Sequence, residues 1–420
     1  MTRRNFLKAT ASAAAAAPLI LPSHMRAADT HANGRIGVGY IGAGRLSRRL
    51  LFEFLHEDAQ VLAVCDVDTT RRKAARKTVD DFYRKNPDKG SPACKDYGDF
   101  RELLAREDID AVCIATPDHW HAVITLAALR SGKDIYCEKP LTHDIAEAVA
   151  VMKAVGNAKR VLQTGSMQRS MKEFRVACEL VRNGAIGTLL RVECNFGDPP
   201  IACDLPEEPA EPGLDWDLWL GPAAQRPYNS VLSPRGVHKH FPKWRNYREF
   251  GGGQVADWGA HQLDVAQWAM GMDHSGPVEV VPPGVKDPKR LTFTYANGIP
   301  MYHGGAADCV FHGTDGTILV SRGGIHSEPR GILATPLDAS AVHLNRHRGH
   351  RDDFLHCVRT REKTIATAEI GHRTSTCCQL GNICHVLQRP LKWDPETERF
   401  VGDDEANRLL GRAMRSPWRL

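Results

Sequence analysis

The stretch "RIGVGYIGAGRLSRRLLFEFLHED", from Arg35 to Asp58, decides the fold of this chain. Its first half reads as a strand that ends in glycines, and its second half places apolar residues at helical spacing. Strand and helix patterns then alternate as far as "VLQTG", which ends at Gly165. Repeated alternation of this kind predicts a doubly wound parallel sheet of the Rossmann type.

Beyond Gly165 the pattern changes. A helix pattern and a strand pattern lead into a segment rich in Pro, Gly and Trp, and strand patterns separated by the turn signals Asn297-Gly298 and Asp315-Gly316 follow. Helices are expected at 350–360 and 371–388. The sequence therefore predicts an α/β protein with a Rossmann domain over residues 33–165. A C-terminal α+β domain with a largely antiparallel open sheet should occupy residues 166–420.

Length and composition agree with two soluble domains. The chain has 420 residues, of which 42% are hydrophobic and 25% charged. Chains of this length usually form two domains, each with its own hydrophobic core. No apolar run reaches the roughly 18 residues that a membrane span requires. We expect no integral membrane segment in the mature chain.

The N-terminus has a separate pattern. "TRRNFLK", from Thr2 to Lys8, precedes an Ala-rich run and resembles a twin-arginine export signal. We expect residues 1–28 to be a signal peptide and the protein to reach the periplasm or the cell exterior. Removing the four basic residues of this segment from the 55 Lys and Arg leaves 51 against 50 Asp and Glu. A nearly neutral mature chain gives no reason to expect nucleic acid or an anionic membrane as a partner.

The twelve cysteines fit core packing better than disulfides, because the twin-arginine route carries chains that folded in a reducing cytosol. A metal site built from Cys377, Cys378, Cys384 and His385 lacks the close C-x-x-C pairing of zinc sites. The pair His238 and His240 has no nearby partners in the sequence. We expect no metal site.

The glycine-rich turn predicts a dinucleotide site. Gly42 and Gly44 stand between the first strand and the first helix, where backbone amides can hold a pyrophosphate, although Ser47 occupies the position of the usual third glycine. Asp66 ends the second strand and can accept hydrogen bonds from ribose hydroxyls. Its carboxylate favours NAD over NADP, while Arg71 and Arg72 keep NADP possible. Arg45, which follows the glycines, is included in the cofactor site.

A second stretch, "GGGQVADWGAHQLDVAQW" from Gly251 to Trp268, places Asp257 and His261 four residues apart. On one helix, both side chains would lie on the same face. An acid and an imidazole together suit proton transfer. The alternative is that Asp257 is only the N-cap of the helix that follows.

"YCEKPL" (residues 136–141), "ATPDHWHA" (residues 115–122) and the D-x-x-x-H of Asp257 and His261 together resemble the Gfo/Idh/MocA oxidoreductases, the family of glucose-fructose oxidoreductase and inositol dehydrogenase. "LDWDLWLGPA", "WRNYREFGGGQVADWGAH" and "EIGHRTST" resemble its exported, twin-arginine branch. The resemblance covers nearly the whole mature chain. It implies that Lys139 reaches the reacting hydroxyl, with Asp257 and His261 completing the proton-handling group, and that the peptide bond before Pro140 is cis. It further implies a cofactor cleft lined by Thr116, Pro117, His121, Glu138 and Lys139.

The chemistry of these residues assigns provisional roles. Oxidation of a secondary alcohol needs a proton acceptor beside the carbon that releases hydride. His261 is the better base at neutral pH, and Lys139 would polarise the substrate oxygen, with a base role for Lys139 as the alternative. Asp257 would fix the tautomer of the imidazole or stabilise its cation.

Aromatic and basic residues of the long segment suit a polyhydroxylated ring, although each could simply pack beneath the loop: Trp216, Trp219, Trp244, Arg245 and Tyr247. The expected substrate-binding residues are Lys139, Arg169, Trp244, Arg245 and His261. Three functions remain open: a sugar or cyclitol oxidoreductase, a redox-neutral NAD-dependent glycosidase or lyase, and a non-catalytic sugar-binding protein. The resemblance also implies a homo-oligomer formed through the C-terminal sheet.

Overall fold

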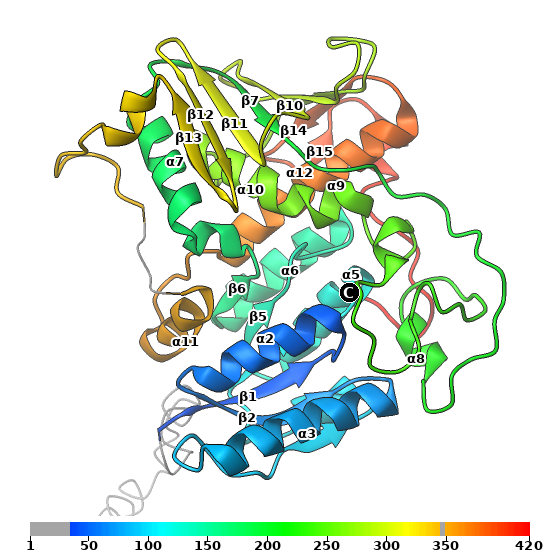
Figure 1. Ribbon diagram of the computed structural model, residues 1–420. Coiled ribbons are helices and arrows are strands. Elements are labelled where there is room, and N and C mark those ends of the chain that lie inside the picture. Colours follow the sequence, from blue (N-terminus) through cyan, green and yellow to red (C-terminus); the bar gives the residue numbers. More distant parts are fainter. Residues whose placement is uncertain (1–33, 345–348) are drawn as a thin grey trace, which may run out of the picture.

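Two sheets organise the chain, one in each half (Figure 1). The computed structural model describes residues 34–344 and 349–420. The predicted signal segment lies outside the described residues. Within them, no helix is long and apolar enough to cross a membrane.

The first sheet is parallel and has the strand order β3-β2-β1-β4-β5-β6. This order confirms the Rossmann arrangement predicted from the alternating pattern. Its strands, in chain order, are β1 (Ile36–Ile41), β2 (Ala59–Cys65), β3 (Lys95–Tyr97), β4 (Ala111–Ile114), β5 (Asp134–Cys137) and β6 (Leu162–Thr164). Strands β1, β4, β5 and β6 are completely buried, because helices cover both faces of the sheet.

The helices of this half follow the sequence pattern closely. Asp68 caps α3 and Asp144 caps α6, each by accepting a hydrogen bond from a backbone N–H in the first turn. The helices are α2 (Arg45–His56), α3 (Thr69–Lys85), α4 (Phe100–Leu104), α5 (Asp118–Arg130) and α6 (Ile145–Ala158).

The second sheet has nine strands in the order β13-β12-β11-β7-β10-β9-β8-β14-β15. All neighbours pair antiparallel except β10 and β7. The expected turns at Asn297-Gly298 and Asp315-Gly316 join β9 to β10 and β11 to β12. The strands are β7 (Leu189–Cys194), β8 (Glu279–Val281), β9 (Thr292–Thr294), β10 (Pro300–His303), β11 (Cys309–Gly313), β12 (Thr317–Ser321), β13 (Gly324–Glu328), β14 (Leu391–Asp394) and β15 (Arg399–Phe400).

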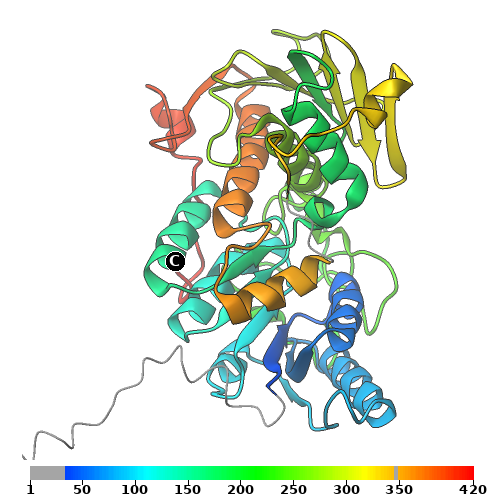
Figure 2. The ribbon, with the colours of Figure 1, turned by 90° about the vertical axis from the view of Figure 1, so that its left-hand side faces the viewer.

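Helices cover one face of this sheet (Figures 1 and 2). The covering helices are α7 (Lys172–Arg182), α10 (Gly259–Met270) and α12 (Ala368–Leu387). All twelve cysteines are free, and all except Cys203 are buried. The core packing expected for them is therefore confirmed.

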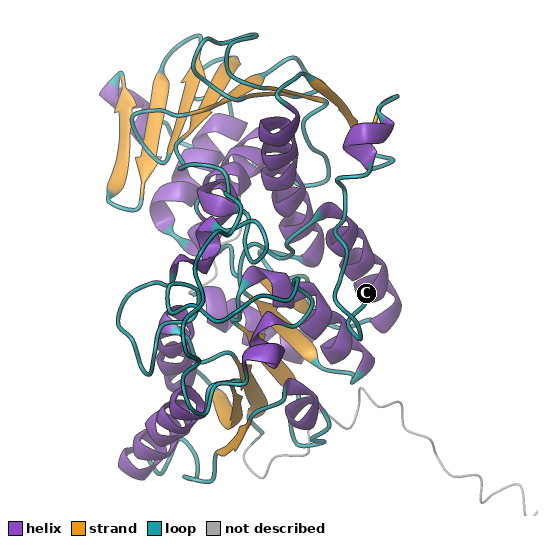
Figure 3. Ribbon diagram, turned by 90° about the vertical axis from the view of Figure 1, so that its right-hand side faces the viewer, coloured by secondary structure: helices purple, strands orange, loops and turns teal. Residues whose placement is uncertain are grey.

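The long connection from β7 to α10 carries little regular structure and lies along one side of the molecule (Figure 3). It contains α8 (Trp216–Leu220), a 3-10 turn at Lys243–Asn246 and α9 (Gly253–Asp257). Trp219, Trp244 and Phe250 form a small apolar cluster under this connection. The segment reaches the first half at α2, where Arg48 and Arg45 donate hydrogen bonds to the carbonyls of His238 and Lys239.

Two late segments return to the Rossmann half. Helix α11 (His350–Thr360) places Phe354 against the rings of Phe54 and Tyr136, at 6.4 and 5.8 Å between ring centroids. The C-terminal tail places Trp418 against Trp120. The expected division near Gly165 therefore describes the two sheets but not the whole path of the chain.

Candidate active site

A cavity of about 480 Å³ lies between the two halves. Its walls come from the carboxyl ends of β1, β2, β4 and β5, the loop before α9, the α9–α10 junction, and the turn between β12 and β13. Carboxyl ends of parallel strands are where open α/β sheets bind ligands. The cavity contains most of the site residues predicted from the sequence.

The glycine turn at one end of the cavity fits a dinucleotide. Gly42 has φ +95°, and a Cβ atom there would lie 2.6 Å from the carbonyl oxygen of Ala115, so only glycine fits. Gly44 is the N-cap of α2 and provides no side-chain cap, which leaves the first amides of the helix for a phosphate. Ser47 is buried and its hydroxyl donates to the carbonyl of Gly42, so the serine closes the turn onto the helix.

Asp66 stands at the end of β2, beside this turn. Its Oδ2 accepts the N–H of Ala43 at 2.6 Å, and its Oδ1 accepts the N–H of Asp68 at 2.8 Å. Burial raises the pKa of Asp66, while the charge of Arg71 opposes the shift. The carboxylate is thus held at the position from which an acid accepts ribose hydroxyls in this fold.

The expected cleft residues Thr116, Pro117, His121 and Glu138 also line the cavity. The ring of His121 lies between the carbonyl oxygens of Pro140, 2.7 Å away, and Thr116, 3.0 Å away. It connects the turns that follow β4 and β5. Burial lowers the pKa of His121 to about 4 and raises that of Glu138 to about 7. The peptide bond between Lys139 and Pro140 is cis, as the resemblance implies.

Lys139 and Asp257 form an ion pair at the other end of the cavity. Lys139 Nζ lies 2.6 Å from Asp257 Oδ1, and Arg245 Nε lies 3.5 Å from Asp257 Oδ2. Burial alone would raise the pKa of Asp257, but the charges of Lys139 and Arg245 lower it below its usual value. The ionised carboxylate of Asp257 therefore pairs with both Lys139 and Arg245.

This pairing corrects two expectations about Asp257. Its carboxylate faces Lys139 and Arg245 and does not hold the imidazole of His261. It is also not an N-cap, because Asp257 ends α9 and the next helix begins at Gly259 after Trp258, without a side-chain cap. Gly253, with φ +67°, begins α9, whereas an N-cap at Asp257 would have started the helix at Trp258.

His261 lies in the first turn of α10 and lines the same end of the cavity. It is 6% exposed, and its Nδ1 has no hydrogen-bond partner among the described residues. Burial lowers the pKa of His261 well below its usual value, and the charges of Lys139 and Arg322 lower it further. The imidazole is therefore neutral at pH 7, the form that accepts a proton.

Asp118 is a site residue that the sequence reasoning missed. It begins α5, is 4% exposed and lines the cavity. Burial raises its pKa to about 7, although the charge of Arg245 opposes the shift and the backbone N–H of Gly252 donates to it. A signal was present, since Asp118 lies inside "ATPDHWHA" directly after the strand-ending Thr116 and Pro117.

Arg169, expected to bind substrate, does not line the cavity. Its guanidinium makes a bidentate contact with Asp264 at 2.8 Å and also lies 2.7 Å from Asp273. The side chain is 1% exposed. Arg169 therefore joins the 3-10 turn at Met167–Ser170 to α10, and its expected substrate role is corrected to a structural one.

The aromatic residues of the long connection divide into two groups. Trp219, Trp244 and Arg245 line the cavity, and the guanidinium of Arg245 lies 4.2 Å from the Trp244 ring. Trp216 and Tyr247 do not line it; they pack within the apolar cluster under the connection. For Trp216 and Tyr247 the alternative therefore applies: they pack beneath the connection and do not contact a ligand in the cavity.

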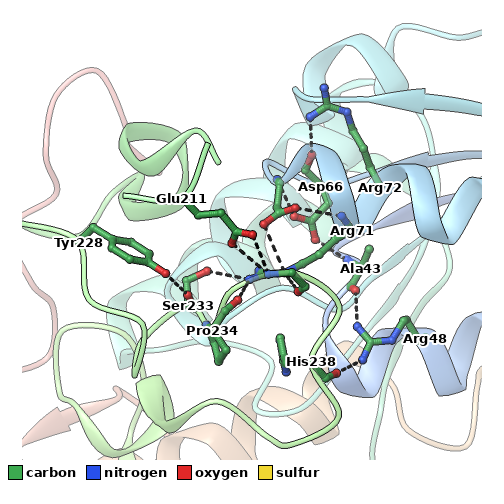
Figure 4. A network of polar contacts seen from close by, with 12 residues as sticks. Ala43, Arg48, Asp66, Arg71, Arg72, Glu211, Tyr228, Ser233, Pro234 and His238 are labelled. Carbon is green, nitrogen blue, oxygen red and sulfur yellow. Dashed lines mark hydrogen bonds and ion pairs between the residues drawn. The ribbon is translucent and has the colours of Figure 1, made fainter. Parts of the chain in front are cut away.

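Residues 232–246, here called the strap, cover the dinucleotide end of the cavity. Arg71 donates to Ser233 Oγ and Gly236 O, both at 3.2 Å, and to Pro234 O. Arg48 donates to His238 O, and Arg45 Nε donates to Lys239 O at 2.9 Å. Figure 4 shows Arg48 and Arg71 reaching the strap from the side of Asp66. Three arginines of the Rossmann half thus hold a segment of the second half over the glycine turn.

Within residues 34–344 and 349–420, no group of three or more His, Cys, Asp or Glu side chains is placed to hold a metal ion.

The parallel sheet, its glycine turn and the ionisable groups opposite that turn define the class of nucleotide-dependent oxidoreductases with a Rossmann domain. Residues 36–166 match the NAD-binding Rossmann fold of an oxidoreductase family, and residues 202–420 match the C-terminal α/β domain of the same family. The chain belongs to this family, the Gfo/Idh/MocA oxidoreductases.

Curated relatives match part of the chain. The inositol 2-dehydrogenase of Salmonella typhimurium is 34% identical over 160 residues, which cover 38% of this chain and 44% of that protein. A glycosyl hydrolase family 109 protein of Shewanella baltica is 30% identical over 165 residues, 38% of this chain and 35% of that protein. The chain thus spans less than half the length of these relatives.

A solved structure shows the shared fold over a longer range. The aldose-aldose oxidoreductase of Caulobacter crescentus, complexed with glycerol, has a TM-score of 0.58 and 19% sequence identity. The match covers 85% of this chain and 99% of that chain.

Proposed function

We propose that this protein oxidises a secondary alcohol of a sugar or cyclitol and passes the hydride to bound NAD. One observation carries the proposal: Lys139, Asp257 and His261 line one end of a cavity whose other end is the glycine turn. The inositol 2-dehydrogenase and aldose-aldose oxidoreductase among its relatives support the substrate class.

The side chains at this end have complementary roles. Lys139, which forms an ion pair with Asp257, donates a hydrogen bond to the substrate oxygen and stabilises negative charge on it. His261, which is neutral and has a free Nδ1, accepts the hydroxyl proton. NAD supplies the hydride acceptor. Asp257 acts on Lys139 and not on the imidazole.

The cofactor proposed is NAD. Asp66 would repel the 2′-phosphate of NADP, and the two arginines that could offset this repulsion are already engaged. Arg71 is hydrogen-bonded to the strap, and Arg72 lies 3.4 Å from Asp96. Neither side chain is free to bind an added phosphate.

The strap supports a cofactor that stays bound between turnovers. It covers the dinucleotide end and is held by side chains from the opposite half, so release requires these contacts to open. The export proposed from "TRRNFLK" would place the protein where little free NAD is available. A retained cofactor must then be reoxidised in place.

The second candidate is a redox-neutral glycosidase or lyase, in which a sugar is oxidised transiently, loses its glycosidic substituent and takes the hydride back. The glycosyl hydrolase family 109 relative and the covered cofactor site favour this reading. Both candidates use the same Lys139 and His261. They differ in the fate of the hydride: in the first candidate a second substrate must accept it from the cofactor, and in the second it returns to the same sugar after the glycosidic substituent has left.

The test uses the full-length protein purified without added NAD. Cofactor content is measured first, by denaturing the protein and assaying the released nucleotide. Sugars and their aryl glycosides are then added, while absorbance reports reduced nicotinamide and a colour assay reports aglycone. Aglycone release without net NADH supports the second candidate, and reduction of the bound cofactor by free sugars supports the first. Sugar binding with neither reaction would leave only the non-catalytic sugar-binding protein.

We further propose a homo-oligomer formed through the face of the nine-stranded sheet opposite α7, α10 and α12. This face carries a charged network in which Arg290 contacts Glu193 and Asp287 and lies over Tyr302. Light scattering on the purified protein measures the oligomeric state. A Glu193→Arg variant, which opposes Arg290, should dissociate the assembly, and an unchanged mass would exclude this face.

A further inference from the structure

We propose that the substrate is an anionic sugar, a hexuronic acid or its glycoside, whose carboxylate binds Arg322. The inference rests on the proposed function and specifies its substrate class. It comes from the balance of charge at the substrate end of the cavity.

Three cations line this end: Lys139, Arg245 and Arg322. Asp257 is the carboxylate that pairs with the first two, at 2.6 and 3.5 Å. Two further acids line the cavity near these cations, Asp118 and Glu138, and burial raises the pKa of each to about 7, so both are only partly ionised at neutral pH. The site therefore carries an excess of positive charge, which a substrate carboxylate would neutralise.

Arg322 is the cation left without a partner. Among the described residues, no carboxylate lies within ion-pair distance of its guanidinium and no side-chain hydrogen bond holds it; the carboxylate of Asp308, which accepts its backbone N–H, is the strongest opposing charge near it. Arg49, a further arginine of the cavity wall, lies 3.0 Å from Glu53 and is already paired. A guanidinium presents five N–H donors in a planar arrangement that matches a carboxylate.

Arg322 is an exposed residue, and both its backbone and its guanidinium contact neighbouring residues. It lies in the turn between β12 and β13, and its backbone N–H donates to Asp308 Oδ2 at 3.2 Å. Its guanidinium lies over the indole of Trp258, 4.8 Å from the ring centroid. Trp258 stands between the proton-handling residues Asp257 and His261 in the chain.

Trp258 adds a surface for the sugar ring. It is 41% exposed although it lines the cavity, and its ring lies 6.0 Å from that of His261. An exposed indole beside an unpaired guanidinium offers an apolar face for the ring and a charged group for its carboxylate. A neutral sugar would leave the guanidinium unused.

The test compares paired sugars on the holoprotein as purified: glucose with glucuronate, galactose with galacturonate, and mannose with mannuronate. Binding is followed by calorimetry, and reduction of the bound cofactor by absorbance. At least one uronate should bind tenfold or more tightly than its neutral partner, and 0.5 M salt should reduce that preference. Arg322→Gln should bring the two Kd values within about twofold of each other, and Arg322→Lys should restore part of the difference.

Arg330→Gln is the matched control, because Arg330 is an exposed arginine outside the cavity. It should leave the preference unchanged. Equal binding of acid and neutral sugars by the unaltered protein would overturn the inference, as would loss of cofactor without loss of uronate affinity in Arg322→Gln. If neutral sugars alone reduce the cofactor, the proposed function stands and the anionic substrate does not. If no sugar of either kind binds, both fall.

Discussion

Lys139 donates two hydrogen bonds to Asp257, one to its carboxylate at 2.6 Å and one to its backbone carbonyl at 2.7 Å. The pair joins the end of β5 to the end of α9, and so joins the two halves of the chain at the cavity. His261 remains outside this pair. The ammonium and the imidazole are therefore separate groups, and each can be tested alone.

Replacing Lys139 or His261 by Ala should lower turnover roughly 10² to 10⁴-fold, the usual worth of acid and base catalysis. In the His261 variant the cofactor content should stay the same, because the glycine turn, Asp66 and the cleft residue Lys139 are untouched. Steady-state and single-turnover absorbance measurements give the rate. Lys153→Ala and His326→Ala, which alter exposed residues, should be unaffected. A near-native rate in either active-site variant would remove that residue from the mechanism.

Asp66→Ala should relax the preference for NAD over NADP. Loss of the carboxylate removes repulsion of the 2′-phosphate and ribose hydrogen bonds, so NADP affinity should rise relative to NAD by about tenfold. Fluorescence titration of protein stripped of nucleotide measures both constants. Asp88→Ala is the control, since Asp88 is exposed. If the unaltered protein binds both cofactors equally, Asp66 is not the selector.

Asp118→Asn should change the pH dependence of both turnover and stability. Burial raises the folded pKa of Asp118 to about 7, so the folded protein holds an extra proton between about pH 4 and 7. The contribution of Asp118 to stability is complete below pH 4 and is lost as the pH rises through 7. Between pH 5 and 8 the unaltered protein should lose on the order of 2 kcal/mol relative to the variant in urea unfolding.

Turnover should show the same ionisation. Above pH 7 the charged carboxylate offsets part of the positive charge of Lys139 and Arg245, and a weaker positive charge at Lys139 lets His261 accept a proton more readily. The rate should rise through pH 7 in the unaltered protein and lose this step in Asp118→Asn. Parallel pH profiles for the two proteins would show that Asp118 does not titrate there.

Arg71→Ala should speed the release of cofactor. It removes three hydrogen bonds from the strap while leaving Lys139 and His261 in place. Dissociation of NAD, followed after dilution into an enzyme trap, should become at least about tenfold faster, since each bond in a buried position contributes about 1 kcal/mol. Arg76→Ala, on the same helix but away from the strap, is the control. Unchanged release would mean that the strap does not retain the cofactor.

Arg169→Met should destabilise the fold without a specific effect on catalysis. It leaves the buried Asp264 without its guanidinium, and breaking a buried ion pair costs about 3–5 kcal/mol. Urea unfolding measures this loss, and turnover per folded molecule should stay within about twofold. Arg408→Met, at an exposed position, should change neither. A loss of sugar affinity with normal stability would return Arg169 to the substrate site.

The Rossmann half was predictable because its signals are local. Each strand and helix has apolar residues at the spacing typical of its type. The glycines of the turn mark a backbone conformation that other residues rarely adopt, so they can be recognised in the sequence. β3 was missed because Lys95–Tyr97 has three residues and no buried side chain, and its strand form depends on pairing with β2. A segment of three residues does not reveal which strand it pairs with.

The residues of the site were easier to predict than their partners. Lys139, Asp257 and His261 stand in recognisable patterns. Whether the Asp257 carboxylate contacts His261 or Lys139, however, depends on how α9 packs against the end of β5. Arg169 was misassigned because its sequence does not reveal the two acids that reach it from α10 and beyond. Arg322 follows an ordinary strand pattern in the sequence. It reaches the cavity only because the turn between β12 and β13 lies beside α10 in the folded chain.

The packing of α11 against Phe54 and Tyr136 bears on the order in which the protein can fold during synthesis. The nucleotide-binding half begins near the N-terminus, yet one of its covering helices is translated only after both the strap and most of the second sheet. A nascent chain that ends near Gly165 would expose these aromatic rings to the cytosol. Until α11 leaves the ribosome these rings lack the helix that covers them, and a fragment of the first half alone should therefore be prone to aggregate.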